Sequence, residues 1–161
     1  MLIFHGVSFN ELNMYFAVVY YPKIEHEGFL AFRDKYEPYA SLLPPYVSLV
    51  YPVEDSIGQK NLSDHIRKVA ESWQPFELRF QSNLELTWDN WMKLLAEEGH
   101  EQVVRLHDHL YTGVLEPHLR KDLPYNAYIG IGLFSHEEYD FNNSTAKTTL
   151  NKDKYEQAKR E

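Results

Sequence analysis

Two strand-like segments share one pattern, and this repeat constrains the fold more than any other feature of the chain. Residues 43–52 and 123–134 each open with a proline-marked turn and run into an apolar stretch. They enter that stretch as Tyr-Val-Ser-Leu (46–49) and Tyr-Ile-Gly-Ile (128–131). Side chains alternate across a strand, so the first and third residues of each pattern face the same side. The repeat predicts two similar half-domains whose matching faces line a groove.

Residues 14–82 make up the first predicted lobe. The run 14–21 is rich in β-branched and aromatic residues and almost continuously apolar, which predicts a central strand covered on both faces. Aromatic residues at helical spacing predict a helix just after it. The predicted elements of this lobe are a strand at 14–21, a helix at 25–36, the first tyrosine strand ending at Pro52, a helix from 61 that Pro75 ends, and strands at 76–81 and 84–88.

Residues 91–161 repeat the same order in a second predicted lobe. Its elements are a strand beginning at 91, a long helix at 101–119 with a weak point at Gly113, the second tyrosine strand, a polar loop at 135–151 and the start of a helix at 152–161. The closing strand equivalent to 76–81 has no counterpart, so we expect a truncated fold or a strand supplied by another chain. The sequence therefore predicts one bilobal α+β domain over 1–161, with two β-α-β lobes related by an approximate two-fold around a central groove.

The composition excludes several kinds of site. Hydrophobic residues make up 43% of the chain and aromatic residues 15%, which is enough for a packed core. Asp and Glu number 24 against 16 Lys and Arg, and the net charge of −8 argues against non-specific nucleic-acid binding. Without cysteine, disulfides, thiolate catalysis and cysteine-bound zinc are excluded. Residues 1–7 lack a basic leader and a long apolar run, so we expect a soluble cytoplasmic protein that does not enter a membrane.

The two tyrosine strands resemble the signature motifs of the 2H phosphoesterase superfamily, specifically bacterial proteins similar to 2′-5′ RNA ligase. In that family, each lobe has a strand that opens with His-x-Thr or His-x-Ser, usually after a proline. Residues 45–52 match the first motif apart from its histidine, and residues 128–134 match the second apart from its histidine and its hydroxyl residue. Residues 105–113 resemble the helix that precedes the second motif in one branch. The resemblance covers nearly the whole chain from Met14 onwards.

The resemblance implies metal-independent chemistry on phosphodiesters, without a cofactor, typically on 2′,3′-cyclic phosphates or 2′-5′ linkages in RNA. One motif histidine takes a proton from the attacking oxygen, the other gives one to the leaving oxygen, and the hydroxyls hold the phosphate. The matching catalytic positions here are Tyr46, Ser48, Tyr128 and Gly130. A phenol has an ordinary pKa of about 10 and is a poor base at neutral pH. The two-histidine mechanism therefore cannot operate as it does in the family.

Three hypotheses about function stay open. In the first, the protein is a catalytically impaired member of this family, a pseudoenzyme that still binds a nucleotide or an RNA end carrying a phosphodiester or cyclic phosphate. In the second, it is an active cyclic phosphodiesterase with an unusual acid–base pair, for which histidines elsewhere are candidates. In the third, it is a non-catalytic interaction domain. The tyrosines are compatible with natural drift and with deliberate replacement.

Tryptophans and histidines outside the motifs are weaker candidates. Trp88 and Trp91 flank a predicted turn and are candidate substrate-binding residues because aromatic rings stack on bases, although core packing is the commoner role of tryptophan. His107 and His109 are two residues apart on a predicted helix and do not face each other, which makes them a poor ligand pair. We predict no metal site. Ser48 lacks the glycine pattern of a nucleophile elbow.

Overall fold

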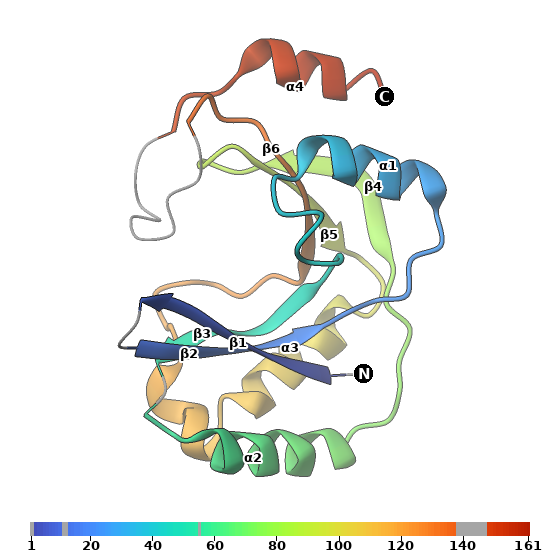
Figure 1. Ribbon diagram of the computed structural model, residues 1–161. Helices are drawn as coiled ribbons and strands as arrows, with labels where there is room; N and C mark the ends of the chain where they lie inside the picture. Colours follow the sequence, from blue (N-terminus) through green and yellow to red (C-terminus); the bar gives the residue numbers. More distant parts are fainter. Residues whose placement is uncertain (1, 11–12, 55, 138–147) are drawn as a thin grey trace. The chain divides into compact units, whose positions relative to one another are not determined.

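The computed structural model describes residues 2–10, 13–54, 56–137 and 148–161 and shows a mixed α+β protein (Figure 1). The chain forms two compact units, each assembled from three segments. Unit 1 comprises Met1–Tyr21, Val47–Phe80 and Ala96–Tyr128, whereas unit 2 comprises Pro22–Tyr46, Gln81–Leu95 and Ile129–Glu161. The units are thus interleaved along the chain. The predicted lobes at 14–82 and 91–161 describe a repeat of element order, and they stay a prediction.

Unit 1 is built on a three-stranded antiparallel sheet in the order β1–β2–β3. Its strands are β1 (Leu2–Asn10), β2 (Asn13–Tyr20) and β3 (Val47–Glu54). The place of β2 in the middle confirms the central strand predicted at 14–21. Strand β1 has no counterpart among the predicted elements; it pairs with β2 from Leu2 opposite Tyr20 to Asn10 opposite Asn13.

Strand β3 carries two β-bulges. Its register against β2 shifts between Ser48 and Val50 and again between Val50 and Val53, and at each place β3 has one residue more than its partner. Pro52, which has no N–H to give to the ladder, lies within the second bulge. The strand therefore continues through Pro52 to Glu54, and its predicted end at Pro52 is wrong.

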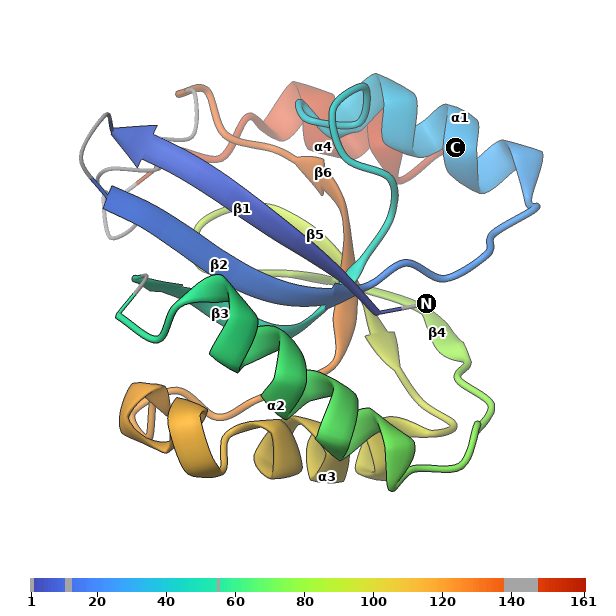
Figure 2. The same cartoon turned by 60° about the horizontal axis from the view of Figure 1, so that its bottom comes forward.

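Two helices cover one face of this sheet, and Figures 1 and 2 show them side by side. They are α2 (Gln59–Glu71) and α3 (His100–Leu110), and a 3₁₀ helix, η1 (Gly113–His118), follows α3. The helix predicted over 101–119 is therefore wrong in extent. Gly113 has a positive φ of 55°, which an α-helix does not allow, and Pro117 cannot donate within a helix.

Unit 2 contains most of a second three-stranded sheet, in the order β4–β5–β6. Its strands are β4 (Phe80–Leu86), β5 (Trp91–Ala96) and β6 (Tyr128–Leu133). The Phe134 N–H donates to Asn90 O at one end and the Ala96 N–H donates to Ala127 O at the other, so β5 and β6 run antiparallel. The strands predicted at 76–81 and 84–88 are in fact one strand, and the first half of 76–81 is irregular.

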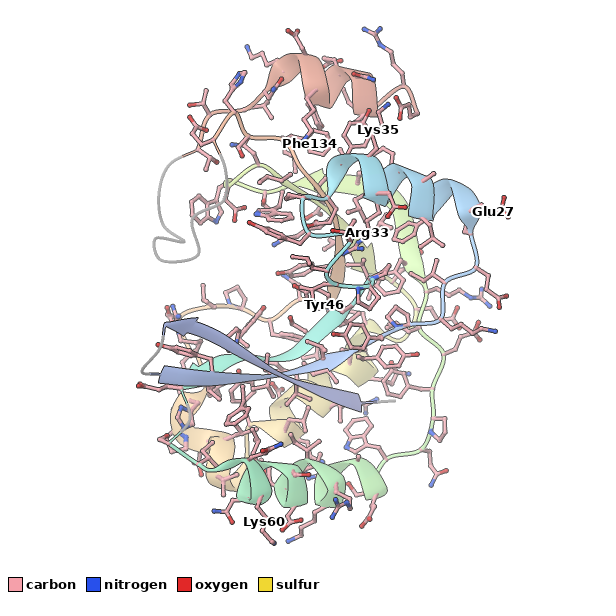
Figure 3. The ribbon with its side chains drawn as sticks, viewed as in Figure 1. Glu27, Arg33, Lys35, Tyr46, Lys60 and Phe134 are labelled. Carbon is pink, nitrogen blue, oxygen red and sulfur yellow. The ribbon has the colours of Figure 1, made fainter. Side chains whose placement is uncertain are left out.

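Helices α1 (Glu27–Tyr36) and α4 (Lys152–Ala158) pack beside each other in unit 2 (Figure 2). The Lys35 ammonium donates to the Glu161 carboxylate, and the ring of Phe134 lies 5.4 Å from that of Tyr36 and 5.6 Å from that of Tyr155. Figure 3 shows Lys35 and Phe134 between the two helices. Most of the polar loop predicted at 135–151 lies outside the described residues. None of the helices described is long and apolar enough to cross a membrane.

Candidate functional site

The bulges of β3 keep its polar and aromatic side chains on one face. Val47, Leu49, Val50 and Val53 are at most 7% exposed and pack into the core. Because Leu49 and Val50 both face inward at the first bulge, the alternation restarts one residue later. Ser48, Tyr51 and Glu54 then share the opposite face, which a regular strand would not give them. Tyr46 directly precedes the strand and is half-buried like Ser48 (Figure 3).

Four aromatic side chains gather beside β3, which is an edge strand of its sheet. The Tyr125 hydroxyl donates to the Ser48 carbonyl oxygen over 2.8 Å, and the Tyr51 N–H donates to the Tyr111 hydroxyl over 3.1 Å. The Tyr51 and Tyr125 rings meet edge to face at 6.3 Å, and the His107 ring stacks on Tyr125 at 3.8 Å. These contacts join β3 to helix α3 and to the segment before β6. We call Tyr51, Tyr111 and Tyr125 the tyrosine cluster.

Burial keeps the tyrosine cluster protonated. It raises the pKa of Tyr51 to about 12, and the nearby Tyr128 adds to this shift. Burial also raises the pKa of Tyr111 and of Tyr125 above the ordinary tyrosine value. Since Tyr128 contributes to the shifts of both Tyr51 and Tyr125, the second motif position lies close to the cluster. At neutral pH these phenols can donate hydrogen bonds but cannot serve as bases.

Strand β6 places the second motif. Ile129, Ile131 and Leu133 are buried, and Tyr128 and Gly130 are half-buried on the other face. Among the described residues, a Cβ at Gly130 would meet only Glu37 Oε2, at an ordinary contact distance of 3.9 Å. Close packing therefore does not explain the glycine at position 130.

A buried carboxylate lies next to Gly130. Glu37 follows α1, is 7% exposed, and accepts a hydrogen bond on Oε1 from the Tyr39 N–H at 3.2 Å. Burial raises the pKa of Glu37, while Arg33 and Lys154 act in the opposite direction. Arg33 is 4% exposed, and its Nε has no hydrogen-bond partner among the described residues. Unit 2 thus holds, beside a motif position, a carboxyl whose protonated form is favoured by burial.

Comparison with known proteins identifies the family of this chain. Residues 21–157 match the model of the 2′-5′ RNA ligase superfamily. This chain belongs to that superfamily. Proteins named "Putative phosphoesterase" are similar to it: one from Bacillus licheniformis is 25% identical over 118 residues (72% of this chain, 67% of that protein). Others come from Geobacillus kaustophilus, 25% identical over 128 residues (73% and 74%), and Geobacillus thermodenitrificans, 23% identical over 130 residues (73% and 75%).

The segment matched to the 2′-5′ RNA ligase superfamily contains all four predicted catalytic positions. The chain passes between its compact units at Tyr46–Val47 and again at Tyr128–Ile129, directly after the first residue of each motif. Ser48 and Tyr128 therefore belong to unit 1, where the tyrosine cluster connects them, and Tyr46 and Gly130 belong to unit 2, where Glu37 adjoins Gly130.

The two candidate tryptophans occupy different environments in unit 2. Trp88 lies in the turn between β4 and β5 and is 69% exposed, so core packing is wrong for this residue. Trp91 begins β5 and is half-buried. Lys93 lies two residues further along the same strand, where burial lowers its pKa. Stacking of either tryptophan on a base stays a prediction.

The two histidines of α3 make separate contacts. The buried His107 ring stacks on Tyr125, and its Nδ1 lies 3.0 Å from Asp108 Oδ1. His109 Nδ1 instead accepts a hydrogen bond from the Trp73 indole at 3.0 Å. The two side chains thus serve different neighbours, and the described residues contain no group of three side chains able to hold a metal ion.

The motif patterns of the sequence do not identify the tyrosine cluster or Glu37. Tyr111 and Tyr125 lie outside the motif strands, and only the tertiary fold brings them to β3. The one available signal for Glu37 is its place directly before Pro38, where a helix must end and a side chain can turn back over it.

Proposed function

We propose that this protein binds a nucleotide or an RNA end carrying a phosphodiester or cyclic phosphate, through motif strands β3 and β6, with little or no turnover. Membership of the 2′-5′ RNA ligase superfamily supports the substrate class, because that family implies phosphodiester substrates and RNA ends. The observation that carries the second part is the set of protonated phenols around Ser48. The Tyr111 hydroxyl accepts a hydrogen bond from the Tyr51 N–H and can give its own proton to a phosphate oxygen, whereas the Tyr125 hydroxyl already donates to the Ser48 carbonyl oxygen. No phenol there can take the proton of an attacking hydroxyl or water.

The proposal is tested with 2′,3′-cyclic nucleotides in two assays. A ligand that prefers the native state stabilises it by about 2.7 kcal/mol at a concentration of 100 times its Kd, which raises the melting temperature by roughly 5–10 °C. We expect such a shift for the cyclic nucleotides without ring opening, as followed by phosphorus NMR. Clear turnover that disappears in Ser48→Ala would overturn the claim of impaired catalysis. No shift with any nucleotide would favour a non-catalytic interaction domain.

A second candidate function, an active phosphodiesterase, is favoured by Glu37 alone. Its buried carboxyl lies beside Gly130 with a raised pKa, the environment in which a carboxylic acid protonates a leaving oxygen. If wild-type protein opens the cyclic phosphate, Glu37→Gln decides this candidate. If Glu37 is the general acid, the variant loses activity, and any activity that remains no longer falls at high pH. Unchanged activity in the variant would exclude Glu37 as the acid.

A further inference from the structure

Unit 1 contains a pocket beside the tyrosine cluster. Its volume is about 380 Å³, within the range of sites for small organic ligands. Residues 51–54 of β3 form one wall, Tyr111 and the end of η1 form another, and Arg120 and Leu123 lie on the segment that leads towards β6. Every lining residue belongs to unit 1.

The double bulge of β3 links this pocket to the first motif. Ser48, Tyr51 and Glu54 share one face of the strand because each bulge adds a residue. The Tyr125 hydroxyl donates to the Ser48 carbonyl oxygen, and its ring meets the Tyr51 ring edge to face. If the phosphate of a ligand binds at Ser48, the pocket therefore lies beside it, further along the same face of β3.

The lining of the pocket suits a flat aromatic group with polar edges. Tyr51 and Tyr111 supply aromatic walls, and Leu123, which is 48% exposed, adds an apolar contact surface. Within the described residues, no hydrogen bond or ion pair occupies the Glu54 carboxylate or the His118 ring. Arg120 is fixed by two hydrogen bonds to Asp122, of 2.8 and 2.6 Å.

From these features we propose that the pocket takes the base of the bound nucleotide, with guanine preferred. A carboxylate accepts hydrogen bonds only, and guanine presents two adjacent donors, N1–H and the 2-amino group, whereas adenine, cytosine and uracil each present a single suitable donor group. Glu54 pairs with those two donors, the base stacks between Tyr51 and Leu123, and His118 and Arg120 face the ribose. The inference rests on the proposed function and specifies which part of the nucleotide lies in unit 1.

Isothermal titration of the four 2′,3′-cyclic nucleotides against the full chain tests the pocket. The guanine nucleotide is expected to bind at least about fivefold more tightly than the other three, the smallest discrimination usual for a two-bond base contact. Glu54→Gln should abolish this preference and leave binding of the other three unchanged. Leu123→Glu should weaken all four by about tenfold, whereas the matched variant Leu84→Glu, at a leucine 42% exposed in β4, should change none.

The outcomes separate this inference from the proposed function. If all four nucleotides bind equally and neither Glu54→Gln nor Leu123→Glu changes their affinity, the pocket is not the base site, and the proposed function stands. Preference for a base other than guanine that survives Glu54→Gln overturns the role of Glu54. If no nucleotide binds, both the proposed function and the pocket inference fail. Circular dichroism of each variant verifies that it is folded.

Discussion

Burial decides the chemistry available at single residues of this protein. The phenols of Tyr51, Tyr111 and Tyr125 stay protonated because burial disfavours their charged form, and the Glu37 carboxyl is held towards its protonated form for the same reason. The residues near the motifs are therefore rich in hydrogen-bond donors.

The raised pKa of Glu37 predicts how stability depends on pH. Between its ordinary value of 4.5 and its raised folded value, the folded state binds more protons than the unfolded state. Stability of the wild type should therefore fall as pH rises through that window, relative to Glu37→Gln. Urea denaturation from pH 4 to pH 8 measures the difference, with Glu27→Gln, an exposed carboxylate on the same helix, as control (Figure 3). The raised pKa of Glu37 is contradicted if the difference in unfolding free energy between the wild type and Glu37→Gln is constant with pH. It is also contradicted if the wild type becomes the more stable of the two as pH rises.

Replacement of the two glycines of β6 by alanine should affect the stability of the protein in opposite ways. A Cβ at Gly132 would lie 2.8 Å from Tyr36 Cβ and 3.0 Å from Phe134 Cε2, so Gly132→Ala should destabilise the protein by about 1–3 kcal/mol. Gly130→Ala meets no such contact and should be neutral or stabilising by up to about 1 kcal/mol. Midpoints of urea unfolding compare the two variants. Equal destabilisation would show that position 130 also requires a glycine for packing.

At the scale of elements, the glycines that begin α2 and α3 differ in what surrounds them. Gly58 and Gly99 have φ values of 81° and 82°, so alanine at either position costs about 1–2 kcal/mol in backbone strain. A Cβ at Gly99 would also overlap the carbonyl oxygen of Glu77, while none of the described atoms lies within 4 Å of a Cβ at Gly58. Gly99→Ala should thus cost at least about 1 kcal/mol more than Gly58→Ala. Similar unfolding free energies for the two variants would refute this packing of α3 against the segment before β4.

The sequence predicted those helices and strands that have a long apolar run or a sustained helical spacing of apolar residues. The strand at 14–21, the helix at 25–36 and both tyrosine strands are confirmed, because apolar runs and helical spacing identify such elements without tertiary information. Two errors fall where one residue changes the backbone, namely at Pro52 inside a bulge and at Gly113 at the end of α3. The others are β1, which was not predicted, and β4, which was divided into two strands. The candidate site was predicted only at its motif positions, since the neighbours of Ser48 and Gly130 come from distant segments.

At the scale of the whole molecule, both motifs fall where the chain crosses between its compact units. The crossings after Tyr46 and after Tyr128 occur at equivalent positions of the repeat, so each unit contains residues of both motifs. This equivalence agrees with the match to the 2′-5′ RNA ligase superfamily over 21–157.

Restoration of the two histidines tests the central claim most directly. Wild-type protein, the double variant Tyr46→His/Tyr128→His, and the same variant with Gly130→Thr are incubated with 2′,3′-cyclic nucleotides, and ring opening is measured by phosphorus NMR. We predict no ring opening by the wild type and measurable ring opening by a histidine variant, because imidazole can act as acid and base near neutral pH. Ring opening by the wild type, lost when histidines replace Tyr46 and Tyr128, would contradict the account.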